Sequence, residues 1–289
     1  MSEEEIEVQF GKMLEIRGFT DGTVRDYQFM FRRFSKWCKE CGILLSEISY
    51  EQLQNYVLHL KKVVGYSPKT VNSNISFLRF VFLYVLHRPI DRYMLPYCRI
   101  DVKEPEILSK EEIIVFLNAL PNIKARAIVT LMYSCGLRVS EVVSLKYNNI
   151  SRARKTVYIE HTKNRSSRYV LLSETALNLL TEYWKTNGCP KDWLFPGSKV
   201  NSHIRKDTVF AYIKQAQNKL GWQDRRITSH TFRHCLGTHM YEAGYDLPYI
   251  QKFLGHKSIT STMVYITLTG HKEYPLLLDA MTAGGISLE

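Results

Sequence analysis

Five short segments of the chain carry side chains that could hold a phosphate or move a proton. In the first, Gly136-Leu137-Arg138, an arginine follows a glycine where a helix is expected to start, and such an arginine can point at an anion near the helix N-terminus. In the second, Lys163 stands in a polar loop between two expected strands, from which a lysine can reach into a site and deliver a proton. Taken singly, each residue could also be an ordinary solvated cation.

The other three segments follow in the C-terminal part of the chain. His230 and Arg233 are three residues apart, so on a helix they share one face and present a proton donor or acceptor beside a planar cation. His256 follows a leucine and a glycine, and Tyr265 comes nine residues later. The alternatives are a buried structural histidine, a surface arginine and a packing tyrosine, since most tyrosines of a chain that has 18 of them are packing residues.

Helices and a hairpin must position these residues. Ser109 and Glu112 form a capping box that opens the second half of the chain. Two β-type runs, 156–160 and 168–172, lie on either side of the loop that contains Lys163 and predict a hairpin. Helical patterns predict helices over 110–120, 123–135, 174–186, 204–220, 230–243, 247–254 and 259–266.

The first ninety residues are predicted to be all helix, with apolar and aromatic stripes that would pack as a small bundle. Two helices are expected over 5–17 and 23–40, a third after the capping box of Ser49 and Gln52, and a fourth after Ser67 and its following proline. The other helix faces are basic, and for any single residue there a solvated face is the alternative. The residues that we expect to contact the phosphates of a nucleic acid are Arg32, Arg33, Lys36, Lys69 and Arg79.

Residues 90–106 lack clear periodicity and contain Pro96 and Pro105, which indicates a linker. A chain of 289 residues is also long for one compact core and suits two domains. The expected fold class is mainly α with a small β-sheet. The expected organisation is a helical domain over 1–92, a linker over 93–106 and an α+β domain over 107–289.

The composition points to a polyanionic partner. Lys plus Arg total 39 against 28 Asp plus Glu, which gives a formal net charge of +11. Such a charge suits binding to nucleic acid or to an anionic membrane. On charge alone, a basic surface without a binding function is an equal alternative. No run of about 20 apolar residues exists and no signal pattern opens the chain, so we expect a cytoplasmic protein with free thiols. Cys38 and Cys41 form a C-x-x-C pair, but no second pair or nearby histidine completes a zinc site, and no cluster of carboxylates suggests a magnesium site. No metal or cofactor is therefore expected.

Taken together, the five segments resemble the tyrosine recombinases, also called phage integrases. An arginine, a loop lysine, H-x-x-R, L-G-H and a tyrosine nine residues later occur in the family's order and at familiar separations. The resemblance covers about 105–270 by motif, and the helical bundle before it resembles the family's core-binding, SAM-like domain. Some relatives have tryptophan where this chain has His256. The chain begins directly with the bundle, without an arm-binding domain, which resembles the short Xer-type and transposon-associated members.

The resemblance implies a site-specific recombinase that cleaves and rejoins DNA through a 3′-phosphotyrosyl intermediate. Arg138 and Arg233 match the family's two arginines and would hold the non-bridging oxygens of the reacting phosphate, where charge must be stabilised. His256 would donate a further hydrogen bond to these oxygens. Tyr265 would be the nucleophile that attacks phosphorus.

Two further residues would move protons in this scheme. A phenol has an ordinary pKa near ~10, so the nucleophile needs help to lose its proton, and His230 matches the position that would assist. Lys163 would protonate the departing 5′ oxygen. The phosphotyrosine bond keeps the free energy of the broken phosphodiester, so the resemblance implies a reaction without ATP, metal or cofactor.

The partners implied are double-stranded DNA recombination sites and further copies of the chain. Family members act as four subunits on two DNA sites, so we expect a homotetramer there, a monomer or dimer when free, and accessory proteins in some settings. Residues 268–281 could pack on a neighbouring subunit or on their own. The competing interpretations are a non-cleaving DNA-binding protein of the same fold, a type IB topoisomerase-like enzyme and a basic RNA-binding protein.

Overall fold

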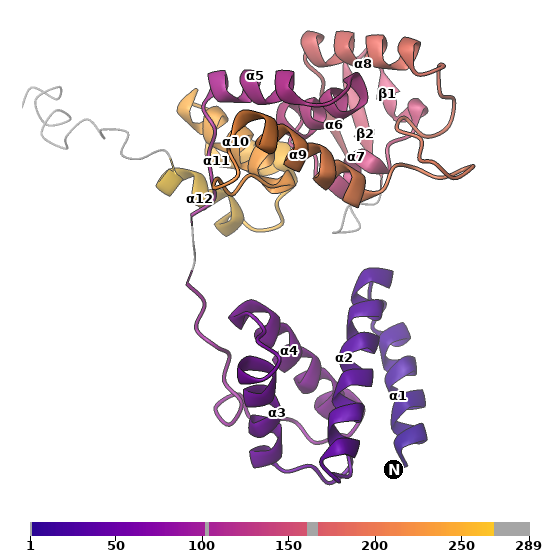
Figure 1. The fold of residues 1–289 in the computed structure, drawn as a ribbon, viewed down its shortest axis with the longest axis vertical. Coiled ribbons are helices and arrows are strands. Elements are labelled where there is room, and N and C mark those ends of the chain that lie inside the picture. Colours follow the sequence, from indigo (N-terminus) through magenta and orange to yellow (C-terminus); the bar gives the residue numbers. More distant parts are fainter. Residues whose placement is uncertain (1, 102–103, 161–166, 269–289) are drawn as a thin grey trace, which may run out of the picture. The chain divides into compact units, whose positions relative to one another are not determined.

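The computed structural model describes residues 2–101, 104–160 and 167–268 (Figure 1). It divides into two compact units, Met1–Lys103 and Glu104–Glu289. The described residues are mostly helical, and the strands among them form one three-stranded antiparallel sheet in the order β1-β2-β3. The predicted fold class, mainly α with a small β-sheet, is therefore confirmed. No helix within the described ranges is long and apolar enough to cross a membrane.

The first unit is built from helices whose starts are encoded locally. Ser49 and Gln52 form the predicted capping box, and Ser67 caps a helix whose first residue is Pro68. Because a cap satisfies backbone N–H groups that would otherwise lack a partner, these residues determine where the chain turns into each helix. The helices of this unit are α1 (Glu3–Ile16), α2 (Asp21–Glu40), α3 (Tyr50–Lys62) and α4 (Pro68–Tyr84).

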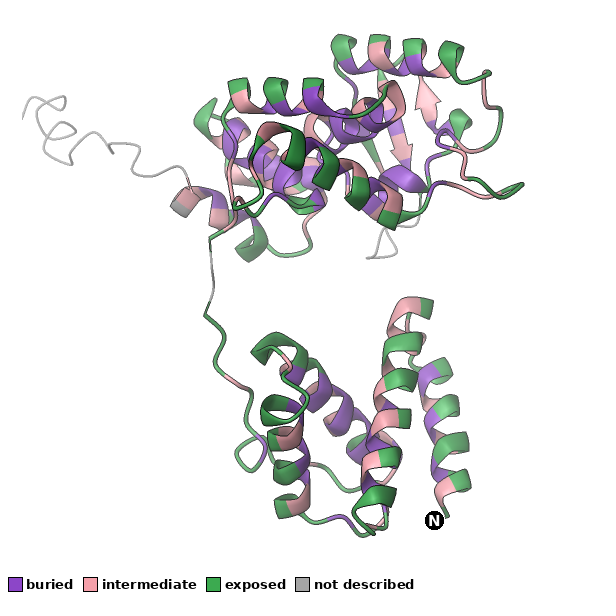
Figure 2. Ribbon diagram, viewed as in Figure 1, coloured by how far each residue is buried: buried purple, intermediate pink, exposed green. Residues whose placement is uncertain are grey.

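Aromatic rings fill the centre of this bundle. Phe10 of α1 stacks on Phe31 of α2 with ring centroids 4.6 Å apart, and the edge of Phe77 meets Phe10 at 6.0 Å. Phe34 and Tyr56, both fully buried, join α2 to α3 at 4.8 Å. The buried stripes run along the helices while the remaining faces are exposed (Figure 2). Burial of several large rings is the main stabilising term for so small a unit.

Arg33 is half-buried and directs its guanidinium toward its own unit. Its guanidinium donates hydrogen bonds to Asn74 Oδ1 at 2.5 Å, to Tyr56 Oη at 3.4 Å and to the Tyr66 hydroxyl. It also lies 4.7 Å from the centroid of the Tyr66 ring, a cation–π contact. Arg33 therefore joins α2 to α3, to α4 and to the loop between them.

A second arginine fastens the segment that follows the bundle. Arg79 of α4 donates to the Leu95 carbonyl at 2.7 Å and lies 4.3 Å from the centroid of the Tyr97 ring. The Asn72 amide exchanges two hydrogen bonds with the Cys98 backbone, at 2.9 and 2.7 Å. Leu95 is only 2% exposed. The first part of the segment expected to be a linker therefore packs along α4.

The second unit contains every predicted helix, with ends shifted by no more than a few residues. The predicted hairpin is also confirmed, since β2 and β3 pair antiparallel in the register Ile159↔Arg168. The helix expected to start at Arg138 is α7, whereas the strand β1 was not expected, because an element of two residues is too short to show a period. The elements are α5 (Lys110–Ala119), α6 (Ile123–Ser134), α7 (Val139–Val143), η1 (Tyr147–Asn149), β1 (Ile150–Ser151), β2 (Thr156–Ile159), β3 (Arg168–Leu171), α8 (Glu174–Thr186), α9 (Lys206–Leu220), α10 (Ser229–Glu242), α11 (Leu247–Leu254) and α12 (Thr260–Leu268).

Helix α6 forms the centre of the second unit. It contacts α5, α7, α8, α9 and α10, and its small residues Ala125 and Ala127 let neighbouring helices approach closely. The sheet adds Val157, Ile159 and Val170 to the same core, alternating with less buried residues as a strand's period of two requires. The core thus holds β3, α7 and α10 in fixed positions around α6.

The two neighbouring arginines of α2 allow a test of the Arg33 network. Replacing Arg33 by methionine leaves Asn74 and two tyrosine hydroxyls without their donor, and we expect a loss of about 2 kcal/mol in the stability of the first unit. Arg32→Met is the matched control, because Arg32 is exposed. Hydrogen exchange of α4 amides in the full chain measures the effect, and equal protection in both variants would contradict the assignment.

Candidate active site

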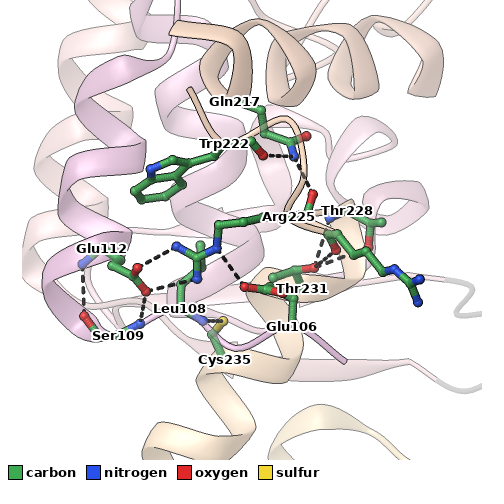
Figure 3. A network of polar contacts seen from close by, with 11 residues as sticks. Glu106, Leu108, Ser109, Glu112, Gln217, Trp222, Arg225, Thr228, Thr231 and Cys235 are labelled. Atoms are coloured by element: carbon green, nitrogen blue, oxygen red, sulfur yellow. Dashed lines mark hydrogen bonds and ion pairs between the residues drawn. The ribbon is translucent and has the colours of Figure 1, made fainter. Parts of the chain in front are cut away.

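The N-terminus of α10, which carries H-x-x-R, is fastened by a polar network (Figure 3). Arg225 donates to Glu106 Oε1 at 2.7 Å and to Glu112 Oε1 at 2.5 Å, and its guanidinium lies 4.7 Å from the Trp222 ring centroid. The side chain of Thr231 accepts the Thr228 N–H at 2.9 Å, which begins the helix as predicted. These contacts tie the start of α10 to the start of the second unit.

Arg233 of α10 joins three of the predicted segments. Its side chain is buried, with the residue 4% exposed, and it donates to the Leu254 carbonyl at 2.5 Å and to the Gly136 carbonyl. Gly136 has φ +60°, and a Cβ there would lie 2.5 Å from the Leu254 side chain, so only glycine fits. Burial first, then the charge of Arg138, lowers the pKa of Arg233 to about 10, which leaves it charged at neutral pH.

Glu141 holds Arg138 at the first turn of α7. The Arg138 N–H donates to Glu141 Oε2 at 2.8 Å, and Arg138 Nη1 donates to Oε1 at 2.9 Å. Arg168 of β3 donates to both oxygens of the same carboxylate at 3.0 Å. Burial alone would raise the pKa of Glu141, but the hydrogen bonds and charges of Arg168 and Arg138 outweigh it and hold that pKa below its ordinary value.

His256 is positioned by a residue of the next helix. Gly255 ends α11 with φ +67°, and the following His256 pairs through Nδ1 with the Thr262 hydroxyl at 2.9 Å. Thr262 is fully buried. Burial first, then the charges of Arg233 and Arg138, lowers the pKa of His256 to about 3, so the ring is neutral. In the tautomer in which the Thr262 hydroxyl donates to Nδ1, the ring carries its proton on Nε2, which can then donate to an anion.

Tyr265 of α12 is enclosed between two histidine rings. Its ring centroid lies 6.3 Å from that of His256 and 6.2 Å from that of His234, and the residue is 0% exposed. It packs over Gly237, where a Cβ would lie 2.2 Å from Tyr265 Cζ. Its hydroxyl is buried and has no hydrogen-bond partner among the described residues. The structure therefore holds the side chain in an enclosed position, within range of the charges of Arg233 and Arg138.

Burial also sets the acidity of this tyrosine. It raises the pKa of Tyr265 to about 12, although the charges of Arg233 and Arg138 act in the opposite direction. A phenol in this position stays protonated at neutral pH. It needs both exposure to a substrate and a proton acceptor before it can act as a nucleophile.

The two remaining candidates lie differently. His230 is exposed in the first turn of α10, one helical turn before Arg233. Lys163 belongs to residues 161–166, outside the described residues, as do nearly all of residues 268–281. The charges of Arg233 and Arg138 both act on His256 and Tyr265, so the structure brings these four side chains near one another.

The candidate DNA-contact residues divide into two groups. Arg32, Lys36 and Lys69 are exposed, and Lys36 forms only a surface ion pair with Glu40 at 3.7 Å. Arg33 and Arg79 instead donate hydrogen bonds within the first unit, as described above. A basic residue in an amphipathic pattern does not reveal whether its guanidinium reaches inward.

Several residues of the site carry no sequence signal strong enough to find them. Arg168 and Thr262 act on the site through partners in other elements, and single arginines and threonines are common. Gly237 gave a weak signal, because a glycine inside a helix that is not near its end usually has a packing reason. No group of three or more metal-ligating side chains occurs in the part of the chain that the structure describes.

Comparison with known proteins agrees with this arrangement. Residues 106–271 match the family model "Phage integrase family", and residues 8–92 match "Phage integrase, N-terminal SAM-like domain". The chain therefore belongs to the phage integrase family and is a tyrosine recombinase with an N-terminal SAM-like domain. The recognition made from the five segments is confirmed.

Individual relatives extend over nearly the whole chain. The integrase/recombinase y4qK of Sinorhizobium fredii is 33% identical over 90% of this chain and 83% of its own length. Tyrosine recombinase XerA of Pyrococcus horikoshii is 28% identical over 90% of this chain and 88% of its own. The solved structure of a lambda integrase dimer bound to a COC′ core site has a similar fold, with a TM-score of 0.74, 17% identity and coverage of 95% and 98%.

The packing of Tyr265 over Gly237 predicts an unusual effect of alanine. In an ordinary helix, Gly→Ala is stabilising by about 1 kcal/mol. At Gly237 the added Cβ would overlap the tyrosine ring, so Gly237→Ala should displace α12 and speed hydrogen exchange of its amides. Gly11→Ala in α1 is the control, since no atom lies within 4 Å of its Cβ position. Unchanged exchange in α12 of Gly237→Ala would rule out this packing.

The two histidines around Tyr265 predict acid sensitivity. The pKa of His234 is lowered by burial to about 4 and that of His256 to about 3, against an ordinary value of 6.5. Below pH 6.5 the unfolded chain binds protons that the folded chain does not, so the free energy of unfolding falls as pH decreases from about 6.5 toward 4. Urea unfolding at several pH values measures this. His234→Gln/His256→Gln should show a shallower dependence, and an equal slope would contradict the assignment.

Proposed function

We propose that this chain is a site-specific recombinase that cleaves and rejoins DNA strands, with Tyr265 as the nucleophile. The observation that carries the proposal is the convergence of Arg138, Arg233 and His256 around Tyr265, from four segments spread over more than a hundred residues. Two guanidinium cations, a neutral imidazole that can donate a hydrogen bond, and a phenol are the groups that transfer of a DNA phosphate to tyrosine requires.

Charge stabilisation is assigned to the two arginines. The reacting phosphate develops negative charge on its non-bridging oxygens, and guanidiniums held in place beforehand need no reorganisation to meet it. Arg233 is held by two backbone carbonyls and Arg138 by Glu141, so both are fixed before DNA arrives. The Nε2–H of neutral His256 adds a hydrogen bond to the same oxygens.

The bond changes balance without an external energy source. The Tyr265 oxygen forms a bond to phosphorus while the bond from phosphorus to the 5′ oxygen breaks, which leaves a 3′-phosphotyrosyl ester and a free 5′ hydroxyl. His230 is assigned to assist removal of the phenol proton, and Lys163 to protonate the 5′ oxygen. Attack by a 5′ hydroxyl on the ester reverses the step and rejoins the strands.

The enclosed position of Tyr265 adds a step before chemistry. Because the residue is 0% exposed, its hydroxyl cannot meet a phosphate until α12 shifts. A hydroxyl buried without a partner costs about 1–3 kcal/mol, so contact with a bound phosphate or a proton acceptor favours the shifted state. DNA binding and exposure of the nucleophile are therefore coupled in this proposal.

The proposed partner is double-stranded DNA at recombination sites, and the proposed location of the enzyme is the cytoplasm. The lambda integrase structure of similar fold is a dimer bound to its core site. We propose that residues 1–92 serve as the core-binding domain, with Arg32, Lys36 and Lys69 toward phosphates, and that 107–289 form the catalytic domain after the linker. A homotetramer on two sites, with a monomer or dimer in free solution and accessory proteins where the sites require them, completes the proposal.

Covalent trapping tests the function. Nicked fragments spanning the DNA around the chain's own gene are incubated with the protein, denatured and searched for a protein–DNA adduct. We expect an adduct with the wild type, loss of at least about 10³-fold in Tyr265→Phe, and no loss in Tyr249→Phe, a residue of α11 that is 43% exposed. An adduct that survives Tyr265→Phe would refute the nucleophile. DNA binding with no adduct from the wild type would favour a non-cleaving protein, and relaxation of supercoiled DNA without site preference a topoisomerase.

A further inference from the structure

We propose that Arg168 is a positioning residue that sets the orientation of Arg138 through Glu141 and supports the turn that carries His256. The inference rests on the proposed function, since it concerns how the phosphate-binding groups are held. Arg168 lies at the start of β3, 27 residues from Glu141 in sequence. It lies in the second unit and is not one of the six catalytic residues predicted from the sequence.

The first observation is how Glu141 is shared. Its side chain is 4% exposed, and its two oxygens accept two parallel bonds from Arg168 but only one side-chain bond from Arg138, through Nη1. A buried carboxylate attracts whatever cation is near, because leaving it unpaired is costly. With Arg168 satisfying most of that demand, the rest of the Arg138 guanidinium remains available to face a phosphate.

The second observation is the contact between Arg168 and the L-G-H turn. A Cβ on Gly255 would lie 3.0 Å from Arg168 Cδ and 3.2 Å from its Nε, so the arginine stem packs directly against the backbone beside His256. The side chain is only 13% exposed. Its charge also contributes to the low pKa of His256. One side chain thus touches the supports of two phosphate-binding groups.

The third observation is the anchorage of Arg168 itself. Its backbone pairs with Ile159 in the β2–β3 register, and Ile159 is buried in the core. The guanidinium is therefore carried by a rigid element and not by a loop. Arginine is required because its planar fork matches both carboxylate oxygens, which the single ammonium of lysine cannot do.

The test compares Arg168→Lys and Arg168→Gln with Arg154→Gln, an exposed arginine in the turn before β2. In the full chain, covalent adduct formation is followed at saturating DNA, and DNA affinity is measured separately. We expect the Arg168 variants to slow adduct formation at least tenfold, with affinity changed less than about threefold, and lysine to recover only part of the rate. Arg154→Gln should behave as the wild type.

A double-mutant cycle shows whether Arg168 acts through Glu141. If it does, Arg168→Gln slows adduct formation by a smaller factor in the Glu141→Gln background than in the wild type, and the remaining loss comes from its contact with the turn that carries His256. Full multiplication of the two losses would overturn the inference in favour of independent action. A wild-type rate in Arg168→Gln would overturn it as well, as would loss of affinity in step with loss of rate.

A readout without cleavage separates this inference from the proposed function. The side-chain Nε–H signal of Arg138 in ¹⁵N spectra of the full chain, assigned by its absence in Arg138→Lys, reports the orientation of its guanidinium. We expect it to shift in both Arg168 variants and to stay unchanged in Arg154→Gln. If the wild type forms no adduct but the Arg138 signal shifts in the Arg168 variants, the recombinase proposal is refuted and the positioning role is supported. An unmoved signal would refute the positioning role.

Discussion

Close placement of three arginines, one buried and two partly buried, is the constraint on which the second unit depends. Burial first, then the charge of Arg138 and also that of Arg168, lowers the pKa of Arg233, and removing such cations from water is costly unless each finds partners. Glu141 and two backbone carbonyls supply these partners from distant parts of the chain. The same contacts that offset the cost also join α7, β3, α10 and the end of α11. Stability and preorganisation for a phosphate are therefore one feature of this fold.

Tyr265, the proposed nucleophile, is held in a different way. Tyr265 is retained by the fit of its ring over Gly237 and between two histidines, while its hydroxyl has no hydrogen-bond partner within the described ranges. Because the ring is held by packing and not by a hydrogen bond, the side chain can leave this position at a modest cost in free energy once its hydroxyl gains a partner elsewhere. The arginines are thus fixed and the tyrosine is exchangeable, which suits an enzyme whose reaction must wait for its DNA.

The first unit shows that net charge and charge placement are separate matters. The chain has a formal net charge of +11, yet Arg33 and Arg79 use their guanidiniums to fasten helices and the segment that follows them. Both side chains lie beside aromatic rings, where a cation contributes to packing as well as to hydrogen bonding. The number of positive side chains that can face a polyanion is therefore smaller than the net charge suggests.

The sequence by itself determined the elements and proposed which residues react. Caps such as Ser49 and Ser109, the hairpin and the helical periods act over a few residues, so they can be seen in the chain, and the ordered motifs indicated the family. Only the tertiary structure decided that Arg168 pairs with Glu141, that Tyr265 is enclosed over Gly237, and how the buried arginines are partnered. Those contacts join residues far apart in sequence, and which ones meet depends on how whole elements pack, which no local pattern encodes.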